Sequence, residues 1–223
     1  MDAYFKNRVE AGRLLAKNLR KYRADQPVVL ALPRGGVPVA AEIARALSAP
    51  LDLVIVRKIG APWQPELAIG AIADAEPPEI VRNEDIILEL DVQQDAFARE
   101  AAEQQREIER RRKVYLNGRP PLPLTGRTAV VVDDGIATGA TMRAALVAVR
   151  RRGAARVVLA VPVAPAATLE ALRPLVDEIV CLATPDVFFA IGAHYADFHQ
   201  VADGEVTALL AEAARQAESA APR

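Results

Sequence analysis

Short apolar runs alternate along the chain with segments of helical periodicity. The apolar runs lie at 27–36, where a Pro/Gly turn ends the run, and at 51–56, 67–73, 127–134, 155–164 and 177–183. The helical segments are predicted at 4–23, 37–47, 91–116, 141–153, 165–173 and 204–217. Continuous apolar runs are typical of strands that are covered on both faces. The alternation therefore predicts an α/β fold, a three-layer sandwich with a mostly parallel central sheet.

Four segments lack this regularity. Residues 57–66 contain two prolines and a glycine and are predicted as a loop. Residues 79–87 are predicted as a short strand and a turn, 117–126 as a proline-rich linker, and 184–199 as an aromatic loop. We expect a single domain over 1–223, with the long helix forming an insertion at about 88–118.

Composition narrows the class of protein. The chain has 223 residues, 52% of them hydrophobic, which is enough for one substantial core. The formal net charge of −1 gives no reason to expect a nucleic-acid or anionic-membrane partner. A single cysteine excludes an intrachain disulfide and fits a reducing compartment. Without a signal-peptide pattern or a long apolar window, the sequence predicts a cytoplasmic protein.

The stretch VVVDDGIATGAT, residues 130–141, carries the clearest candidate chemistry. A predicted strand runs into Asp133 and Asp134, and a Gly/Thr loop then leads into a helix. Amides at the start of a helix bind anions, and the helix dipole favours a phosphate there. Carboxylates accept hydrogen bonds from hydroxyl groups and attract Mg²⁺. A 5-phosphorylated ribose satisfies both halves of the stretch, with its phosphate on the loop and its 2- and 3-hydroxyls on the aspartates.

This stretch closely resembles the 5-phosphoribosyl-1-pyrophosphate (PRPP) signature of the type I phosphoribosyltransferases. It is neither a Walker loop nor a GxGxxG motif. The stretches RKIGAPWQPELAIGAI, NEDI, VPVAP and VCLATP extend the likeness over almost the full chain, to a bacterial branch that is known only by the general family name. The resemblance implies the type I phosphoribosyltransferase fold, PRPP as donor, Mg²⁺ as cofactor and pyrophosphate as product.

The resemblance also implies roles for individual residues. Asp133 and Asp134 would act at the ribose and reach the metal through water or ribose hydroxyls, and Lys58 would assist catalysis. The 5-phosphate loop would comprise Ala137, Thr138, Gly139, Ala140 and Thr141. The pyrophosphate would meet Arg34, Gly35 and Gly36 of the LPRGG turn, and Arg57 and Lys58 at the base of a mobile loop at 57–66.

The acceptor is less well defined by the sequence. In this family an irregular hood covers the acceptor, and here it would span about 184–203, with Phe188, Phe189 and Tyr195 able to stack on a planar base. The 6-oxopurine enzymes of the family carry a proton-transferring aspartate in the phosphate loop. Residues 136–138 provide no acid, so the loop resembles the adenine or orotate type. Glu66 is the candidate general base.

Two other functions remain open at this stage. Some proteins of this fold use the PRPP pocket as a sensor in regulation, although this chain shows no basic or helix-turn-helix appendage. A sugar-phosphate or nucleotide enzyme of different chemistry would also use such a phosphate loop. We expect small-molecule partners, PRPP and a nitrogenous acceptor, and a homodimer in which the long helix at 91–116 takes part.

Overall fold

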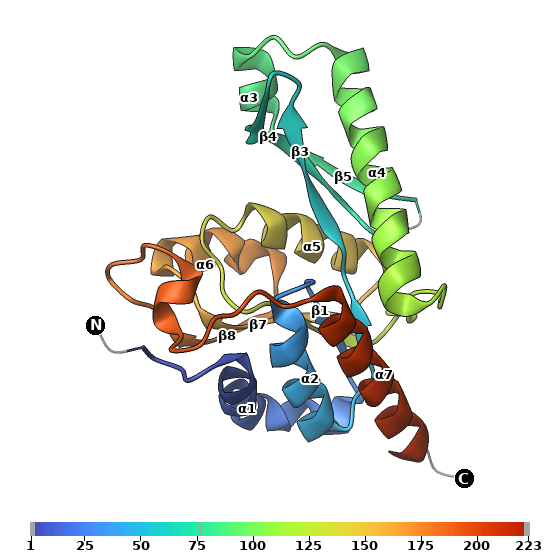
Figure 1. Ribbon diagram of the computed structural model, residues 1–223, viewed down its shortest axis with the longest axis vertical. Helices are drawn as coiled ribbons and strands as arrows, with labels where there is room; N and C mark the ends of the chain where they lie inside the picture. The colour runs from blue at the N-terminus through green and yellow to red at the C-terminus, as the bar shows by residue number, and fades with distance from the viewer. Residues whose placement is uncertain (1–2, 76, 221–223) are drawn as a thin grey trace.

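A central sheet, helices on both of its faces and a projecting arm make up the molecule (Figure 1). The structure is a computed structural model that describes residues 3–75 and 77–220, without the side chains of 66 and 217–220. Within these residues no helix is both long and apolar enough to cross a membrane.

The central sheet has five parallel strands in the order β2-β1-β6-β7-β8. They are β1 (Val28–Ala31), β2 (Leu51–Leu53), β6 (Thr128–Val132), β7 (Arg156–Val163) and β8 (Glu178–Ala183). Each strand coincides with a predicted apolar run. The parallel α/β architecture expected from the sequence is therefore confirmed.

Helices cover the sheet on both faces. The helices α1 (Arg8–Leu19), α2 (Gly36–Leu47) and α7 (Asp203–Ala220) lie on one face, and α5 (Ala140–Arg151) and α6 (Ala166–Leu172) lie on the other (Figure 1). Neighbouring strand residues serve opposite layers: Val130 packs in the cluster of α1 and α2, and Val131 in that of α5 and α6. This double burial explains why the strand sequences show no polar alternation.

The segment predicted as a loop at 57–66 is instead part of a β-hairpin, so that prediction was wrong. Strands β3 (Val56–Ala61) and β4 (Gln64–Ala73) pair antiparallel, and β5 (Glu79–Arg82) pairs with β4. The prolines and the glycine mark an irregularity in the pairing of β3 with β4, because the strand register shifts on both sides of Gly60. A Cβ on Gly60 would lie 2.3 Å from the carbonyl oxygen of Pro65. Local breakers here shape a bulge without preventing strand pairing.

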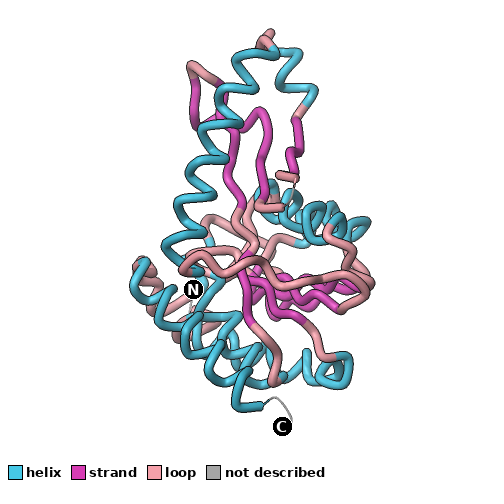
Figure 2. The backbone as a smooth tube through the Cα atoms, turned by 90° about the vertical axis from the view of Figure 1, so that its right-hand side faces the viewer, coloured by secondary structure: helices cyan, strands magenta, loops and turns pink. Residues whose placement is uncertain are grey.

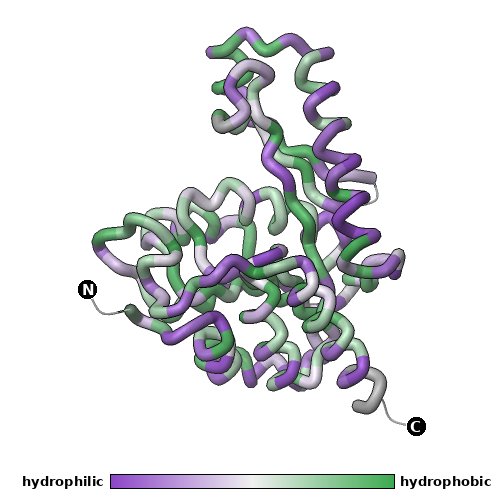
Figure 3. The backbone as a smooth tube through the Cα atoms, in the orientation of Figure 1, coloured by the Kyte–Doolittle hydropathy of each residue, from purple (hydrophilic) through white to green (hydrophobic). Residues whose placement is uncertain are grey.

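Two helices complete the arm, which we define as residues 56–116. The predicted strand and turn at 79–87 is strand β5 followed by α3 (Glu84–Glu89), and α4 (Gln94–Leu116) then lies along the hairpin (Figure 2). Most of α4 is hydrophilic (Figure 3). Its apolar stripe, which includes Phe97, Ala101 and Ile108, packs with Ile59 and Ile69 of the hairpin. The long predicted helix is therefore confirmed, and its status as an insertion stays a prediction.

Two buried carboxylates lie near the base of the arm, Asp52 in the central sheet and Asp74 at the end of β4. Asp52 of β2 is fully buried and accepts a hydrogen bond of 2.6 Å from the amide of Leu122. Asp74, just after β4, is also buried and pairs with Arg112 of α4 at 3.1 Å. Burial raises the pKa of Asp74, and Arg112 opposes that shift. A buried ion pair is costly to break, because one charge is then left without a partner.

The hood segment, residues 184–203, connects β8 to α7. It contains a short 3₁₀ helix, Ile191–His194, and contacts the N-terminal residues. The amide of Phe5 donates to the carbonyl of His194 at 3.1 Å, and the rings of Phe5 and Tyr195 lie 5.4 Å apart. The start of the chain and the hood segment therefore form one unit beside the carboxyl ends of the strands.

Candidate active site at the carboxyl ends of β1 and β6

The acidic pair lies where β6 ends. Asp134 is buried and Asp133 half-buried, and the amide of Asp134 donates to Asp133 Oδ1 at 2.9 Å. Burial and the neighbouring carboxylate of Asp134 raise the pKa of Asp133 well above its ordinary value. Burial also raises the pKa of Asp134, against the opposing effect of Arg8. Two interacting carboxyls titrate as a pair.

The predicted pyrophosphate turn lies directly against this acidic pair. Strands β1 and β6 are neighbours, with Ala31 opposite Val132, so the loops that follow them emerge side by side. A Cβ on Gly35 would lie 2.1 Å from Asp134 Oδ2, and one on Gly36 would lie 2.8 Å from the carbonyl oxygen of Val132. Only glycine permits so close an approach of the backbone. The structure thus brings together two motifs about 100 residues apart in the sequence.

The predicted phosphate loop runs from the acidic pair into α5, whose first residue is Ala140. Gly139 caps the helix with φ of +81°, a conformation that favours glycine. The loop is fixed from behind by Thr168, whose hydroxyl donates to the carbonyl of Ala137 at 2.8 Å. Ala137, Thr138, Ala140 and Thr141 are exposed. An accessible helix N-terminus of this kind can receive an anion.

Sequence reasoning missed Arg8, the first residue of α1. Its Nε lies 2.8 Å from Asp134 Oδ2, and both side chains are largely buried. Arg8 and Asp134 are 126 positions apart, and one arginine in an amphipathic helix carries no signal of a distant partner. No local pattern in the sequence could therefore have identified Arg8.

The three aromatic residues predicted for the acceptor differ in their surroundings. Tyr195 is buried, and its hydroxyl donates to the carbonyl of Asp134 at 2.5 Å. The ring of Phe188 packs 5.1 Å from that of His194, whereas Phe189 is 84% exposed. Tyr195 is therefore the one of the three that contacts the acidic pair, and the stacking role of all three stays a prediction.

Arg57 and Lys58 lie on opposite faces of the hairpin. Arg57 Nε donates to Gln104 Oε1 of α4 at 3.0 Å, and burial lowers its pKa. Lys58 is exposed and pairs in register with Ala71, which in turn pairs with Val81. Residues opposite one another in a sheet share a face. Lys58 thus belongs to the face that looks toward α5, away from α4.

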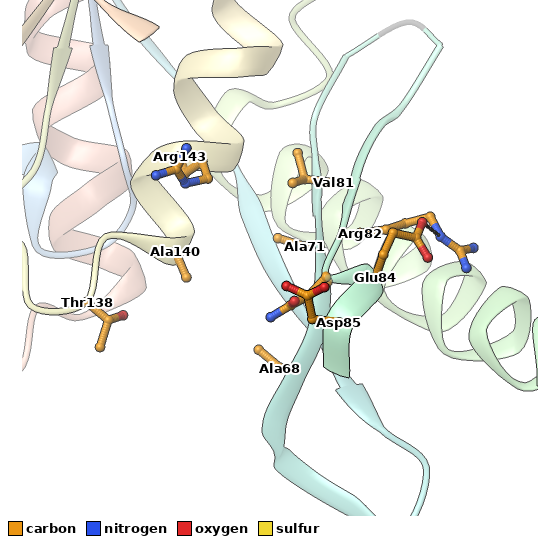
Figure 4. Close-up of a pocket in the computed structure, with 11 residues that line it drawn as sticks. Ala68, Ala71, Val81, Arg82, Glu84, Asp85, Thr138, Ala140 and Arg143 are labelled. Carbon is orange, nitrogen blue, oxygen red and sulfur yellow. Dashed lines mark hydrogen bonds and ion pairs between the residues drawn. The ribbon is translucent and has the colours of Figure 1, made fainter. Parts of the chain in front are cut away.

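A cavity of about 490 Å³ separates this face of the arm from the start of α5 (Figure 4). Its floor consists of small residues of β4, and Thr138, Ala140 and Arg143 line the opposite wall. The arm also contributes Arg82, Asn83, Glu84 and Asp85 to the lining, with the guanidinium of Arg82 turned away over the Phe97 ring of α4 at 4.3 Å from its centre. The predicted phosphate loop is therefore open toward the arm.

A second cavity, of about 380 Å³, adjoins the acidic pair on its other side. It is lined by Arg8, Arg34, Gly35 and Asp134 together with Phe198, His199, Gln200 and Val201 of the hood segment. Arg34 Nη1 lies 3.6 Å from Asp203 Oδ1 at the start of α7. The cavity therefore presents two guanidinium groups beside a glycine backbone, and each group is already paired with a carboxylate, Arg8 with Asp134 and Arg34 with Asp203.

The donor set is compatible with Mg²⁺ that arrives with a phosphorylated ligand. Among the described residues there is no group of three His, Cys, Asp or Glu side chains that could hold a metal ion. Mg²⁺ commonly keeps several waters and binds through one or two carboxylates and substrate phosphates. Asp133 and Asp134 meet that limited requirement. The side chain of Glu66, the predicted general base, lies outside the described residues.

The fold and this site define a class: parallel α/β proteins in which an acidic pair follows a central strand and an exposed glycine-containing loop leads into the next helix. The family profile of the phosphoribosyl transferase domain matches residues 2–197. The chain belongs to the phosphoribosyl transferase domain family.

Specific relatives support this assignment. Two proteins from the CDC 1551 and H37Rv strains of Mycobacterium tuberculosis, provisionally named phosphoribosyl transferases, are each 49% identical over 213 residues. The match covers 95% of this chain and 47% of each relative, so the chain spans about half the length of these curated proteins. The crystal structure of TT1426 from Thermus thermophilus is similar, with 46% identity, a TM-score of 0.80, and coverage of 93% of this chain and 98% of that one.

Proposed function

We propose that the chain transfers the 5-phosphoribosyl group of PRPP to a nitrogenous acceptor, with Mg²⁺ as cofactor and release of pyrophosphate. The observation that carries this proposal is the meeting of three motifs at one edge of the sheet. Asp133 and Asp134, the Arg34–Gly36 turn and the exposed loop before α5 adjoin one another. The carboxylates can accept hydrogen bonds from the ribose hydroxyls, and the arginine and backbone amides of the turn suit the pyrophosphate. The helix N-terminus suits the 5-phosphate of the same ligand.

In this proposal each motif has a separate task. The amides at 137–141 hold the 5-phosphate, and the carboxylates of Asp133 and Asp134 orient the ribose through its hydroxyls. As the bond from ribose C1 to pyrophosphate breaks, positive charge develops on the ring, and the two fixed carboxylates offset it. Arg34 and the amides of Gly35 and Gly36 meet the departing pyrophosphate. Bound Mg²⁺ would neutralise part of the pyrophosphate charge.

The arm is proposed to limit hydrolysis of the donor. Lys58 lies on the face of the hairpin toward α5 and pairs in register with Ala71, which lines the cavity of about 490 Å³ together with Thr138 of the phosphate loop. Movement of the arm toward α5 would narrow this space and exclude water from the reacting groups. We retain Glu66 as the proposed general base: Glu66→Gln should lower turnover and leave PRPP binding intact, and unchanged turnover would contradict its role.

Pyrophosphate release tests the proposed transfer. The wild-type protein is incubated with PRPP, Mg²⁺ and one of adenine, orotate, hypoxanthine or guanine, and pyrophosphate is measured against a reaction without base. We expect base-dependent release that falls about a hundredfold or more in Asp133→Asn, because a group that stabilises the transition state is lost. Arg173→Gln, which removes only an exposed ion pair with Glu170, is the matched control.

A PRPP sensor of the same fold is the second candidate. The exposed phosphate loop and the acidic pair suit binding as well as catalysis, so calorimetry with PRPP accompanies the assay. Binding of PRPP without release of pyrophosphate on any base would favour the sensor. Absence of PRPP binding, with binding of ribose 5-phosphate retained, would instead point to a sugar-phosphate enzyme of different chemistry.

A further inference from the structure

Arg8 is held by three separate contacts beside the acidic pair. Its Nε donates to Asp134 Oδ2 at 2.8 Å, and its Nη1 donates to the carbonyl of His199 at 2.8 Å. Its guanidinium carbon lies 3.8 Å from the centre of the Phe198 ring. The residue as a whole is 7% exposed. A planar guanidinium fixed in its plane by two hydrogen bonds and on one face by a ring has little rotational freedom.

These contacts join three parts of the chain. Arg8 begins α1, Asp134 follows β6, and Phe198 and His199 belong to the hood segment. Tyr195 of the same segment donates its hydroxyl to the carbonyl of Asp134, so Asp134 is held through both its side chain and its backbone. The position of its carboxylate therefore depends on the N-terminal helix and the hood segment together.

The interaction lies at a cavity and not in the interior of the core. Arg8 and Asp134 both line the cavity of about 380 Å³, together with Arg34 and Gly35 of the predicted pyrophosphate turn. A Cβ on Gly35 would lie 2.1 Å from Asp134 Oδ2, the same oxygen that Arg8 binds. A small rotation of that carboxylate would consequently alter the surface presented to a ligand.

We propose that Arg8 is a positioning residue of the donor site, which holds the Asp134 carboxylate in the orientation that recognises ribose hydroxyls. This inference rests on the proposed function, because it requires a phosphorylated ribose at the acidic pair. Arg8 acts through Asp134 and is not assigned a bond to the substrate. Arg8 therefore contributes to recognition of the ribose. The phosphate loop at 137–141 is held separately, by Thr168.

Discrimination between two sugar phosphates tests this role directly. Ribose 5-phosphate and 2-deoxyribose 5-phosphate share the phosphate and differ in one hydroxyl. Calorimetry should give the wild-type protein about tenfold tighter binding of ribose 5-phosphate, and Arg8→Gln should reduce this preference to about twofold. Affinity for inorganic phosphate should stay within about twofold, because Arg8 makes no contact with the phosphate loop. Arg13→Gln is the control, because Arg13 lies on the same helix as Arg8 and its exposed side chain pairs with Glu42 of α2.

Chemical rescue separates positioning from general support of the fold. Millimolar guanidinium chloride should restore at least part of the ribose preference in Arg8→Ala, because the free ion can occupy the vacated site beside Asp134. It should restore none in Asp134→Ala, where the oriented group itself is missing. Arg8→Lys keeps the charge but loses the planar fork and should recover only part of the preference.

The outcomes distinguish the two proposals. If the wild-type protein binds neither PRPP nor ribose 5-phosphate, the proposed function fails. If the wild-type protein prefers ribose 5-phosphate and folded Arg8→Gln keeps the same preference, the role of Arg8 is refuted while the proposed function stands. If Arg8→Lys, Arg8→Gln and Arg8→Ala are all unfolded by circular dichroism, Arg8 supports the fold and the positioning role is also refuted.

Discussion

Gly35 and Asp134 are packed so closely that a single methyl group at residue 35 would meet the carboxylate at 2.1 Å from Oδ2. Asp134 cannot move aside without cost, because Arg8 holds that oxygen. We therefore expect Gly35→Ala to displace the carboxylate and weaken PRPP binding about tenfold or more, as measured by calorimetry. Gly204→Ala is the control, since a Cβ there would meet no atom within 4 Å. Equal PRPP binding by the two variants would contradict this view of the turn.

Gly139 provides a test of the phosphate loop. Its φ of +81° is unfavourable for alanine, and a Cβ would lie 2.8 Å from Cγ2 of Thr168. Gly139→Ala should lower the free energy of unfolding by about 1–2 kcal/mol. It should also weaken binding of inorganic phosphate, because the amides before α5 are displaced. Urea unfolding and phosphate titration measure the two effects, and unchanged phosphate affinity would remove the loop from the proposed site.

Asp133 should oppose folding at neutral pH. Its pKa is raised in the folded protein, so the favourable contribution of its protonated form is complete below about pH 3.8 and is lost as the pH rises through the raised pKa. Asp133→Asn should therefore increase the free energy of unfolding at pH 8, with a smaller gain toward pH 4. Urea unfolding at several pH values tests this. If Asp133→Asn were less stable than the wild-type protein at pH 8, burial would not be disfavouring the charged carboxylate of Asp133.

The two basic residues at the base of the arm should differ in function. Lys58 faces α5, whereas Arg57 contacts Gln104 of α4. Lys58→Met should reduce kcat/KM for PRPP about tenfold or more, because a cation opposite the phosphate loop is lost. Arg57→Met should change it less than about threefold. If Arg57→Met lowered kcat/KM more than Lys58→Met in steady-state assays, the face of the arm that carries Arg57 would be the one that meets the donor.

His199 should titrate above its ordinary range. Hydrogen bonds to Glu205 and Asp197 favour its charged form and raise its pKa from 6.5. The protonated ring therefore stabilises the folded protein below about pH 6.5, and this contribution is lost as the pH rises through the raised pKa. Titration by NMR measures the pKa, with His199→Gln to assign the signal because the chain has two histidines. Glu205→Gln should lower the pKa, and an unchanged value would exclude Glu205 as its cause.

Local sequence patterns predicted the central architecture well. Five predicted apolar runs correspond to β1, β2, β6, β7 and β8. Their apolar sequences are continuous because both faces of the central sheet are buried, and this made the strands predictable. The Gly/Thr loop before α5 was also predictable from the sequence, because the start of a helix and the glycine that precedes it are local features. The prediction for 57–66 was wrong because it relied on prolines and a glycine within the segment. The segment forms a strand through pairing with β4 and packing against α4, which local sequence does not show.

By itself, the sequence determined the parallel α/β class and the order of the elements of the central sandwich, and it led us to expect sugar-phosphate chemistry at 130–141. Tertiary structure decided which side chains meet. It placed Gly35 against Asp134, brought Arg8 from the first helix to the same carboxylate, and turned Arg57 and Lys58 to opposite faces of the arm. Periodicity and capping arise from neighbours along the chain, but the environment of a buried carboxylate arises from segments that only folding brings together.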